Sequence, residues 1–265
     1  MSPFCRRMMI TELTSIEMCA GAGGQALGVE KAGFVHSALI EIDSYCCKTL
    51  RLNRPYWNII EDDLRNFKGI DYRGEIDLLA GGLPCPPFSI AGKRLGKEDE
   101  RNLFCVAIRL IDEIRPKAVM IENVRGILGA IFEDYRKYIA IQVTKMGYVT
   151  EWKLLNACDF GVPQIRPRVI FIAIRREYMG NFYWPVPNYG KPPTVGETIY
   201  GLMAANGWKG AKAWRDQAND IAPTIVGMLS SRAPSAREKT IWPGWAVPKG
   251  GWRRFPGDAG KAYVE

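Results

Sequence analysis

Histidine is almost absent from this chain, since His36 is the only one among 265 residues. A Ser-His-Asp or Cys-His catalytic arrangement would have to use it, and the residues beside it in the sequence offer no orienting partner. Zinc sites built from histidine and paired cysteines are likewise not expected. A lone histidine is usually a packed or surface residue, which is our expectation for His36. The sequence therefore predicts no metal site and a nucleophile that is activated without histidine.

Long apolar runs and paired cysteines are also lacking. No run reaches the roughly 18 apolar residues that a membrane-spanning helix needs, and residues 1–9 lack the extended apolar core of a secretory signal. The cysteines are odd in number and form no CxxC pair, which argues against a disulfide framework. They stand at positions 5, 19, 46, 47, 85, 105 and 158. We therefore expect a reduced, cytoplasmic protein without a membrane partner.

Positive charge is in excess, with a formal net charge of +8. Net charge influences association, so this balance suits a partner with a phosphate backbone such as duplex DNA. The alternative is the ordinary solubility of a basic protein. Charge alone does not indicate the fold.

Strand-like and helix-like segments alternate along the first two thirds of the chain. The strand-like runs lie near residues 14–18, 36–42, 57–60, 76–80, 117–121, 148–156 and 168–174, and the helical patterns at 24–32, 44–53, 103–114 and 132–146. Such alternation predicts βαβ crossovers and an α/β fold with a doubly wound, mostly parallel sheet. The last two strands have only a loop between them, so we expect an antiparallel hairpin at the sheet edge.

Cys85 follows a strand-like run directly, in the segment Gly81-Gly82-Leu83-Pro84-Cys85-Pro86-Pro87-Phe88-Ser89. The surrounding prolines interrupt strand and helix and favour a stiff loop that presents the sulfur. The nearby charges of Lys93 and Arg94 would favour the thiolate, which is the nucleophilic form. The alternative is a small buried apolar side chain, the usual role of cysteine in soluble proteins.

Glu122 ends a second strand-like run, in Glu122-Asn123-Val124. The carboxyl ends of parallel strands line one crevice, so Cys85 and Glu122 could converge on one substrate. Alternatively, Glu122 caps a following helix.

A glycine-rich turn follows the first strand. Gly21, Gly23 and Gly24 allow a ligand to approach the backbone, although they do not fit GxGxxG. Glu41, at the end of the second strand, has the spacing at which an acid meets ribose hydroxyls. The pattern predicts an adenosine site without pyrophosphate, and the alternative is a turn used only for tight packing.

These motifs together resemble the C5-cytosine DNA methyltransferases of bacterial or phage type. Pro84-Cys85 and Glu122-Asn123-Val124 are similar to the catalytic motifs, and the glycine turn is similar to the first motif of that family. Further matches follow in family order at residues 41–43, 62–64 and 159–168. The resemblance covers roughly residues 13–175 and includes six ordered motifs. It implies the Rossmann-like fold of S-adenosylmethionine-dependent methyltransferases and a part in DNA methylation within a restriction-modification system.

The resemblance also implies an S-adenosylmethionine site. Asp63 would accept from the adenine amino group, and Glu17 would face the positively charged methionine end. Cys19 departs from the family, which usually has an aromatic residue there. The full expected set is Glu17, Cys19, Gly21, Gly23, Gly24, Glu41, Ile42, Asp63, Leu64, Gly82 and Pro84.

The expected mechanism starts from a cytosine flipped out of the duplex. The Cys85 thiolate adds to C6, and Glu122, raised in pKa by a dry pocket, protonates N3. Arg166 and Arg168 supply positive charge to the ring oxygen or the target phosphate. The expected substrate-binding residues are Ser89, Lys93, Arg94 and Asn123, and residues 89–101 are expected to form a mobile lid.

The C-terminal third carries fewer signals. We expect a catalytic domain over residues 1–178, and a partial target-recognition region or a poorly ordered basic tail over residues 179–265. The last two motifs of the family are not found. A second subunit could supply them, or the chain could be truncated and inactive alone.

Two other functions stay open. A relative with these motifs could methylate transfer RNA instead of DNA, or the fold could serve as a non-catalytic binding module. The presence of both Cys85 and Glu122 argues against the binding module. The sequence does not indicate a DNA recognition site, because base-reading residues act through groove geometry.

Overall fold

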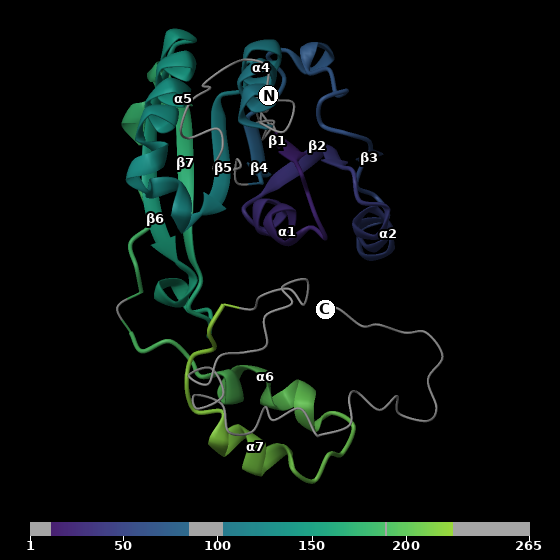
Figure 1. Cartoon of the computed structure of the whole chain (residues 1–265). Helices are drawn as coiled ribbons and strands as arrows, with labels where there is room; N and C mark the ends of the chain where they lie inside the picture. The colour runs from purple at the N-terminus through teal and green to yellow at the C-terminus, as the bar shows by residue number, and fades with distance from the viewer. Residues whose placement is uncertain (1–11, 85–102, 189, 225–265) are drawn as a thin grey trace, which may run out of the picture. The chain divides into compact units, whose positions relative to one another are not determined.

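The computed structural model describes residues 12–84, 103–188 and 190–224 (Figure 1). Its contacts divide the chain into two units, each of which is described by itself. The first unit comprises residues 1–161 and 166–190, and the second comprises residues 162–165 and 191–265. The domain boundary expected at residue 178 stays a prediction.

The first unit contains a seven-stranded sheet in the order β3-β2-β1-β4-β5-β7-β6. Strands β1 to β5 pair in parallel, and β7 runs antiparallel to both β5 and β6. Their bounds are β1 Leu13–Met18, β2 Phe34–Glu41, β3 Ile59–Glu61, β4 Leu78–Gly82, β5 Ala118–Val124, β6 Tyr148–Asn156 and β7 Pro167–Arg175. The mostly parallel sheet with an antiparallel edge hairpin is therefore confirmed.

Helices cover both faces of this sheet (Figure 1). The helices of the first unit are α1 Gly24–Lys31, α2 Ser44–Asn53, α4 Leu103–Ile114 and α5 Glu133–Lys145. Short 3-10 turns lie at Ile70–Tyr72, Arg125–Leu128, Ala130–Phe132, Ala157–Phe160 and Arg176–Asn181. Helix α4 buries Phe104, Ala107, Leu110, Ile111 and Ile114, a spacing that keeps one helical face on the core.

Alternation along β1 divides the core into two layers. Ile16 and Met18 point into the large cluster formed with α4 and α5. The other cluster joins α1 and α2 to the opposite face through Ala26, Leu39 and Leu50. Because successive strand residues face opposite sides, Glu17 belongs to the α1 face, where its register neighbours are Leu39 and Ala80.

The second unit contains a pair of short helices that the sequence patterns did not predict. Helix α6 spans Val195–Ala204 and α7 spans Ala211–Gln217. Thr194 and Glu197 form a capping box at the start of α6. A Cβ on Gly196 would meet the Arg215 carbonyl oxygen at 2.3 Å, so glycine is needed where α6 approaches the end of α7.

Candidate functional site

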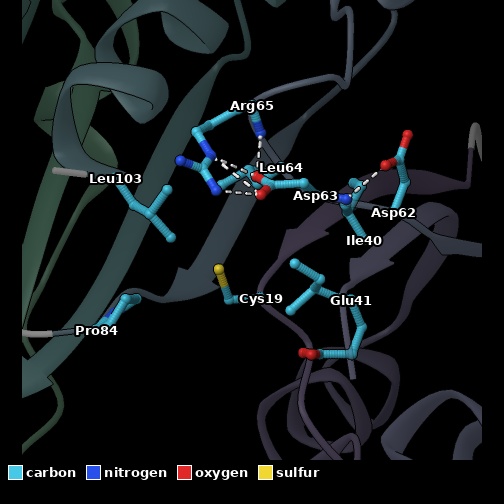
Figure 2. Close-up of a pocket in the computed structure, with 10 residues that line it drawn as sticks. Cys19, Ile40, Glu41, Asp62, Asp63, Leu64, Arg65, Pro84 and Leu103 are labelled. Carbon is cyan, nitrogen blue, oxygen red and sulfur yellow. Dashed lines mark hydrogen bonds and ion pairs between the residues drawn. The ribbon is translucent and has the colours of Figure 1, made fainter. Parts of the chain in front are cut away.

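A cavity of about 230 Å³ lies at the carboxyl edge of the parallel strands (Figure 2). This is the edge at which ligands bind in open α/β sheets. The residues that line it are Cys19, Ile40, Glu41, Ile42, Asp62, Asp63, Leu64, Arg65, Pro84 and Leu103. Of the residues expected to bind a cofactor, Cys19, Glu41, Ile42, Asp63, Leu64 and Pro84 are among them.

The glycine turn between β1 and α1 depends on left-handed backbone geometry. Gly21 has φ 54° and Gly23 has φ 92°. A Cβ on Gly23 would also lie 2.6 Å from Leu50 Cδ2, so a larger residue there would be strained and would have to displace the Leu50 side chain. The Gly21 amide donates to Glu41 Oε2 at 2.7 Å, and the Asp43 amide donates to Glu41 Oε1 at 2.8 Å. Glu41 thereby ties the end of β2 to the turn.

Glu17 is a buried carboxylate without a hydrogen-bond partner among the described residues. Its side chain is fully buried, and neither oxygen has a donor. Burial raises its pKa to about 8, so the isolated group is mostly protonated at neutral pH. A buried unpaired carboxyl group is costly, and a positively charged ligand group would compensate that cost.

Cys19 contributes a thiol to the cavity, as Figure 2 shows. It adopts φ 52°, which is unusual for a non-glycine residue. Burial, followed by the charges of Glu41, Asp63 and Glu17, raises its pKa to about 12. Cys19 therefore stays a neutral thiol and is a poor nucleophile.

The ends of β4 and β5 bring two sequence motifs together. Gly82 is the register partner of Glu122, and the Asn123 side-chain amide donates to the Leu83 carbonyl oxygen at 3.0 Å. Leu83 and the exposed Pro84 lead directly into Cys85. Cys85 itself lies outside the described residues, as do Ser89, Lys93 and Arg94.

The Glu122 carboxylate is ion-paired, and the dry pocket expected around it stays a prediction. Its Oε1 lies 2.6 Å from Arg168 Nε, and the Glu122 side chain is 29% exposed. Arg168 comes from β7, where it pairs in register with Val124 of β5. The role expected for Arg168 at the ring oxygen or the target phosphate did not include this contact, because β7 follows β5 by more than 40 residues in the sequence.

Arg166 stands just before β7 and is half-buried. Its amide donates to Asn156 Oδ1 at 2.9 Å, and its carbonyl oxygen accepts from the Ala157 amide at 3.2 Å. These bonds fix its main chain beside the end of β6. The proposed contact of its guanidinium with a substrate stays a prediction.

His36 is packed, which was one of the two expected outcomes. It lies between Ser15 Oγ, at 2.8 Å from Nδ1, and the Ala26 carbonyl oxygen, at 3.0 Å from Nε2. Burial lowers its pKa, which favours the neutral ring. Its partners come from β1 and α1, so the sequence around His36 could not reveal them. Among the described residues, no group of acids, cysteines and histidine is arranged to hold a metal ion.

Sequence reasoning missed two polar residues at this edge, Arg65 and Gln25. The Gln25 side-chain nitrogen is buried and has no partner in the described part of the chain. A Cβ on Gly82 would lie 3.7 Å from Gln25 Oε1 and 3.5 Å from Glu122 Oε2, so both side chains border the end of β4. The position of Gln25 directly after Gly24, at the start of the first helix, was the only signal available.

The fold and this edge place the chain in a class of α/β methyltransferases. The crystal structure of a prophage-encoded protein from E. coli, assigned as a DNA modification methyltransferase, superposes with a TM-score of 0.60 at 27% identity. It covers 71% of this chain and 54% of that one. The Spodoptera frugiperda DNMT2 structure shares the fold with a TM-score of 0.56 at 22% identity, over 69% of this chain and 58% of that one.

Sequence comparisons give the particular family. The model for C-5 cytosine-specific DNA methylase matches residues 13–240. The type II methyltransferase M.NgoMIV of Neisseria gonorrhoeae is 59% identical over 84% of this chain and 71% of its own length. M.NaeI of Lentzea aerocolonigenes is 51% identical over 81% of this chain and 52% of its own length. Because the family model matches most of the chain, this protein belongs to the C-5 cytosine-specific DNA methylase family.

The match does not extend over the whole length of these relatives. The chain spans 71% of M.NgoMIV, 52% of M.NaeI and 57% of M.Eco47II from Escherichia coli. In the described part of the chain, no helix is both long and apolar enough to cross a membrane.

Proposed function

We propose that this chain transfers a methyl group from S-adenosylmethionine to C5 of cytosine in duplex DNA. The observation that carries the proposal is that the carboxyl ends of β4 and β5 are paired and linked by a hydrogen bond. Glu122 aligns with Gly82, and Asn123 binds the carbonyl oxygen of Leu83, two residues before Cys85. β4 leads toward the Pro84-Cys85 motif and the neighbouring β5 carries Glu122 and Asn123, which supports the proposal that the two motifs act together, although about 40 residues separate them in the sequence.

The residues around the cavity suit an adenosine-containing methyl donor. Glu41 has two acceptor oxygens at the end of β2, each with one main-chain donor already bound and one lone pair left for ribose hydroxyls. Asp63 is the acceptor proposed for the adenine amino group. The orphaned carboxyl group of Glu17 suits the positively charged end. When bound, S-adenosylmethionine supplies a methyl group on a sulfonium, which is a strong electrophile.

Cytosine C5 needs activation before it can take this methyl group. The Cys85 thiolate forms a bond to C6 while Glu122 donates a proton to N3, so that C5 becomes nucleophilic. After the C5–methyl bond forms, water takes the proton from C5, and the C5–C6 double bond re-forms as the bond between Cys85 and C6 breaks to release the thiolate. N3 returns its proton to Glu122. Because C6 is inaccessible inside a duplex, the nucleotide must be flipped out.

The ion pair with Arg168 places the two carboxylate oxygens of Glu122 in different environments. Arg168 holds Oε1, whereas Oε2 faces the position of Gly82. Oε2 is therefore the oxygen proposed to meet the ring nitrogen, and Arg168 fixes its orientation. Arg166 is proposed to contribute further positive charge near the base or its phosphate.

Labelled methyl transfer tests the proposal. The wild-type chain, supplemented with extract of the source cells, should label duplex DNA, and transfer RNA should stay unlabelled. Cys85→Ser should lower the rate by about a thousandfold or more, because the covalent step is lost. Cys46→Ser, on α2 and outside the two catalytic motifs, serves as the matched control. Labelling of RNA instead of DNA, or an active Cys85→Ser variant, would contradict the proposal.

The proposed setting is the bacterial cytoplasm, in association with nucleoid DNA. A second polypeptide that carries the last two family motifs is proposed as a partner. The same assay tests it when run with and without extract of the source cells. Full activity of the chain alone would contradict the need for a partner and leave the proposed reaction intact.

A further inference from the structure

Arg65 forms an ion pair and hydrogen bonds with the carboxylate of Asp63 at the wall of the cavity (Figure 2). Arg65 Nε lies 2.9 Å from Asp63 Oδ1 and 3.0 Å from Oδ2, and Nη2 lies 2.5 Å from Oδ2. The Arg65 amide also donates to Oδ1 at 2.9 Å. Four donor contacts from a single residue thus reach a carboxylate that is 20% exposed.

These contacts leave the Asp63 carboxylate with few lone pairs that can still accept a hydrogen bond. Each carboxylate oxygen offers two lone pairs. Oδ1 accepts from both the amide and Nε of Arg65, which fills it. Oδ2 accepts from Nη2 and shares the Nε proton with Oδ1. Among the described residues, one lone pair on Oδ2 is therefore left to accept a hydrogen bond from a ligand.

The main chain that carries Arg65 is fastened to α4. Arg109 Nη2 donates to the carbonyl oxygens of Arg65, at 3.3 Å, and Phe67, at 3.0 Å. Arg109 is held in turn by Glu113, with Nη1 and Oε1 2.6 Å apart, and Glu113 Oε2 accepts from the Gly69 amide at 2.7 Å. The loop that positions Asp63 is thus braced at several points, as an orienting group requires.

An ordinary surface ion pair in the same protein provides a contrast. Arg51 and Glu61 make one contact of 2.6 Å, with side chains 47% and 37% exposed. Such a pair contributes little to stability. Arg65 is equally exposed, yet its partner is more buried and lines the cavity. The Arg65 contacts also lower the pKa of Asp63, so the acceptor stays ionised.

We infer that Arg65 is a positioning residue for adenine recognition, an inference that rests on the proposed adenosine site. It fixes Asp63 so that a single acceptor lone pair meets the amino group at position 6 of the purine. A purine with a carbonyl oxygen at position 6 would set two acceptors against each other and be rejected. Arg65 thus contributes to discrimination without touching the purine.

Calorimetric binding of two product analogues tests this role without DNA or turnover. The ligands are S-adenosylhomocysteine and S-inosylhomocysteine, which differ at position 6. Wild-type protein should prefer the adenosyl ligand. Arg65→Ala should weaken adenosyl binding by about tenfold and change inosyl binding by less than about twofold. Arg65→Lys, which keeps the charge but lacks the bidentate fork, should fall between wild type and alanine.

Two further variants complete the design. Arg51→Ala, the equally exposed control, should bind both ligands as wild type does. Arg65→Ala should add no further loss in an Asp63→Asn background, because Arg65 acts through Asp63. If Arg65→Ala weakened the binding of both ligands equally, or of neither, the positioning role alone would be overturned. Failure of wild-type protein to bind S-adenosylhomocysteine would overturn the proposed function together with it.

Discussion

Glu17 connects burial, charge and ligand binding at the scale of one residue. Its carboxyl group is enclosed on the α1 face of the sheet without a donor among the described residues. A folded-state pKa of about 8, against an ordinary 4.5, means that the folded chain binds a proton that the unfolded chain releases. The stability contributed by the protonated form is complete below about pH 4.5 and is lost as pH rises through 8.

Replacement of Glu17 by glutamine should remove this pH dependence. Between pH 5 and pH 8, wild-type protein should lose stability relative to Glu17→Gln by up to about 1.4 kcal/mol per pH unit. Urea unfolding at both pH values measures the difference, and Glu75→Gln, an exposed site, controls for the loss of one carboxylate. A constant difference between wild type and Glu17→Gln at the two pH values would contradict the buried, protonated state.

Individual residues also show where sequence reasoning reached its limit. The glycine turn and Glu41 could be recognised because their spacing follows from one βα unit. The ion pair of Glu122 with Arg168 could not, because it depends on β7 lying beside β5. Gln25 and Arg65 carry no motif of their own, and only the packed structure reveals what their side chains face.

At the scale of elements, the site depends on the hydrogen bond that links the end of β5 to the residue after β4. Asn123 is buried, and its amide satisfies the Leu83 carbonyl oxygen while its own Oδ1 accepts from the Val124 amide. Loss of this side chain would leave main-chain groups without partners at the point where the chain enters the Cys85 segment.

Asn123→Ala should therefore destabilise the protein by about 1–3 kcal/mol and lower methyl transfer further than the lost stability explains. Asn58→Ala is the matched control, since Asn58 makes the same type of bond to the Ser37 carbonyl oxygen at 2.8 Å on an exposed surface. Unfolding curves and single-turnover methyl transfer measure the two effects. If the two variants lost stability and methyl-transfer rate equally, the bond between Asn123 and Leu83 would have no special role in the site.

The strands and helices of the first unit followed from the sequence more closely than their arrangement did. The helical patterns at residues 44–53 and 103–114 predicted α2 and α4 at their observed bounds, and the structure shows that Asp43 caps α2. The position of β7 between β5 and β6 depends on pairing between distant segments, which periodicity does not encode. Helices α6 and α7 were not predicted because their short patterns are interrupted by glycine and tryptophan.

At the scale of the whole molecule, the net charge of +8 favours a polyanionic partner. Each phosphate that the protein neutralises releases a counterion, so binding to duplex DNA should weaken as salt rises. We expect the logarithm of the binding constant to fall with the logarithm of salt concentration, with a slope of about −3 to −7. Fluorescence anisotropy at salt concentrations from roughly 50 to 300 mM provides the measurement. A slope near zero would contradict phosphate binding.

The most direct test of the central claim is to trap the covalent bond between Cys85 and cytosine. Duplex DNA that contains 5-fluorocytosine has no proton at C5 to lose, so methyl transfer should leave the adduct in place. Mass spectrometry of the digested chain should then find one nucleotide on the peptide that contains Cys85, and none in the Cys85→Ser variant. An adduct on another cysteine such as Cys19, or methylated DNA without any adduct, would contradict the account.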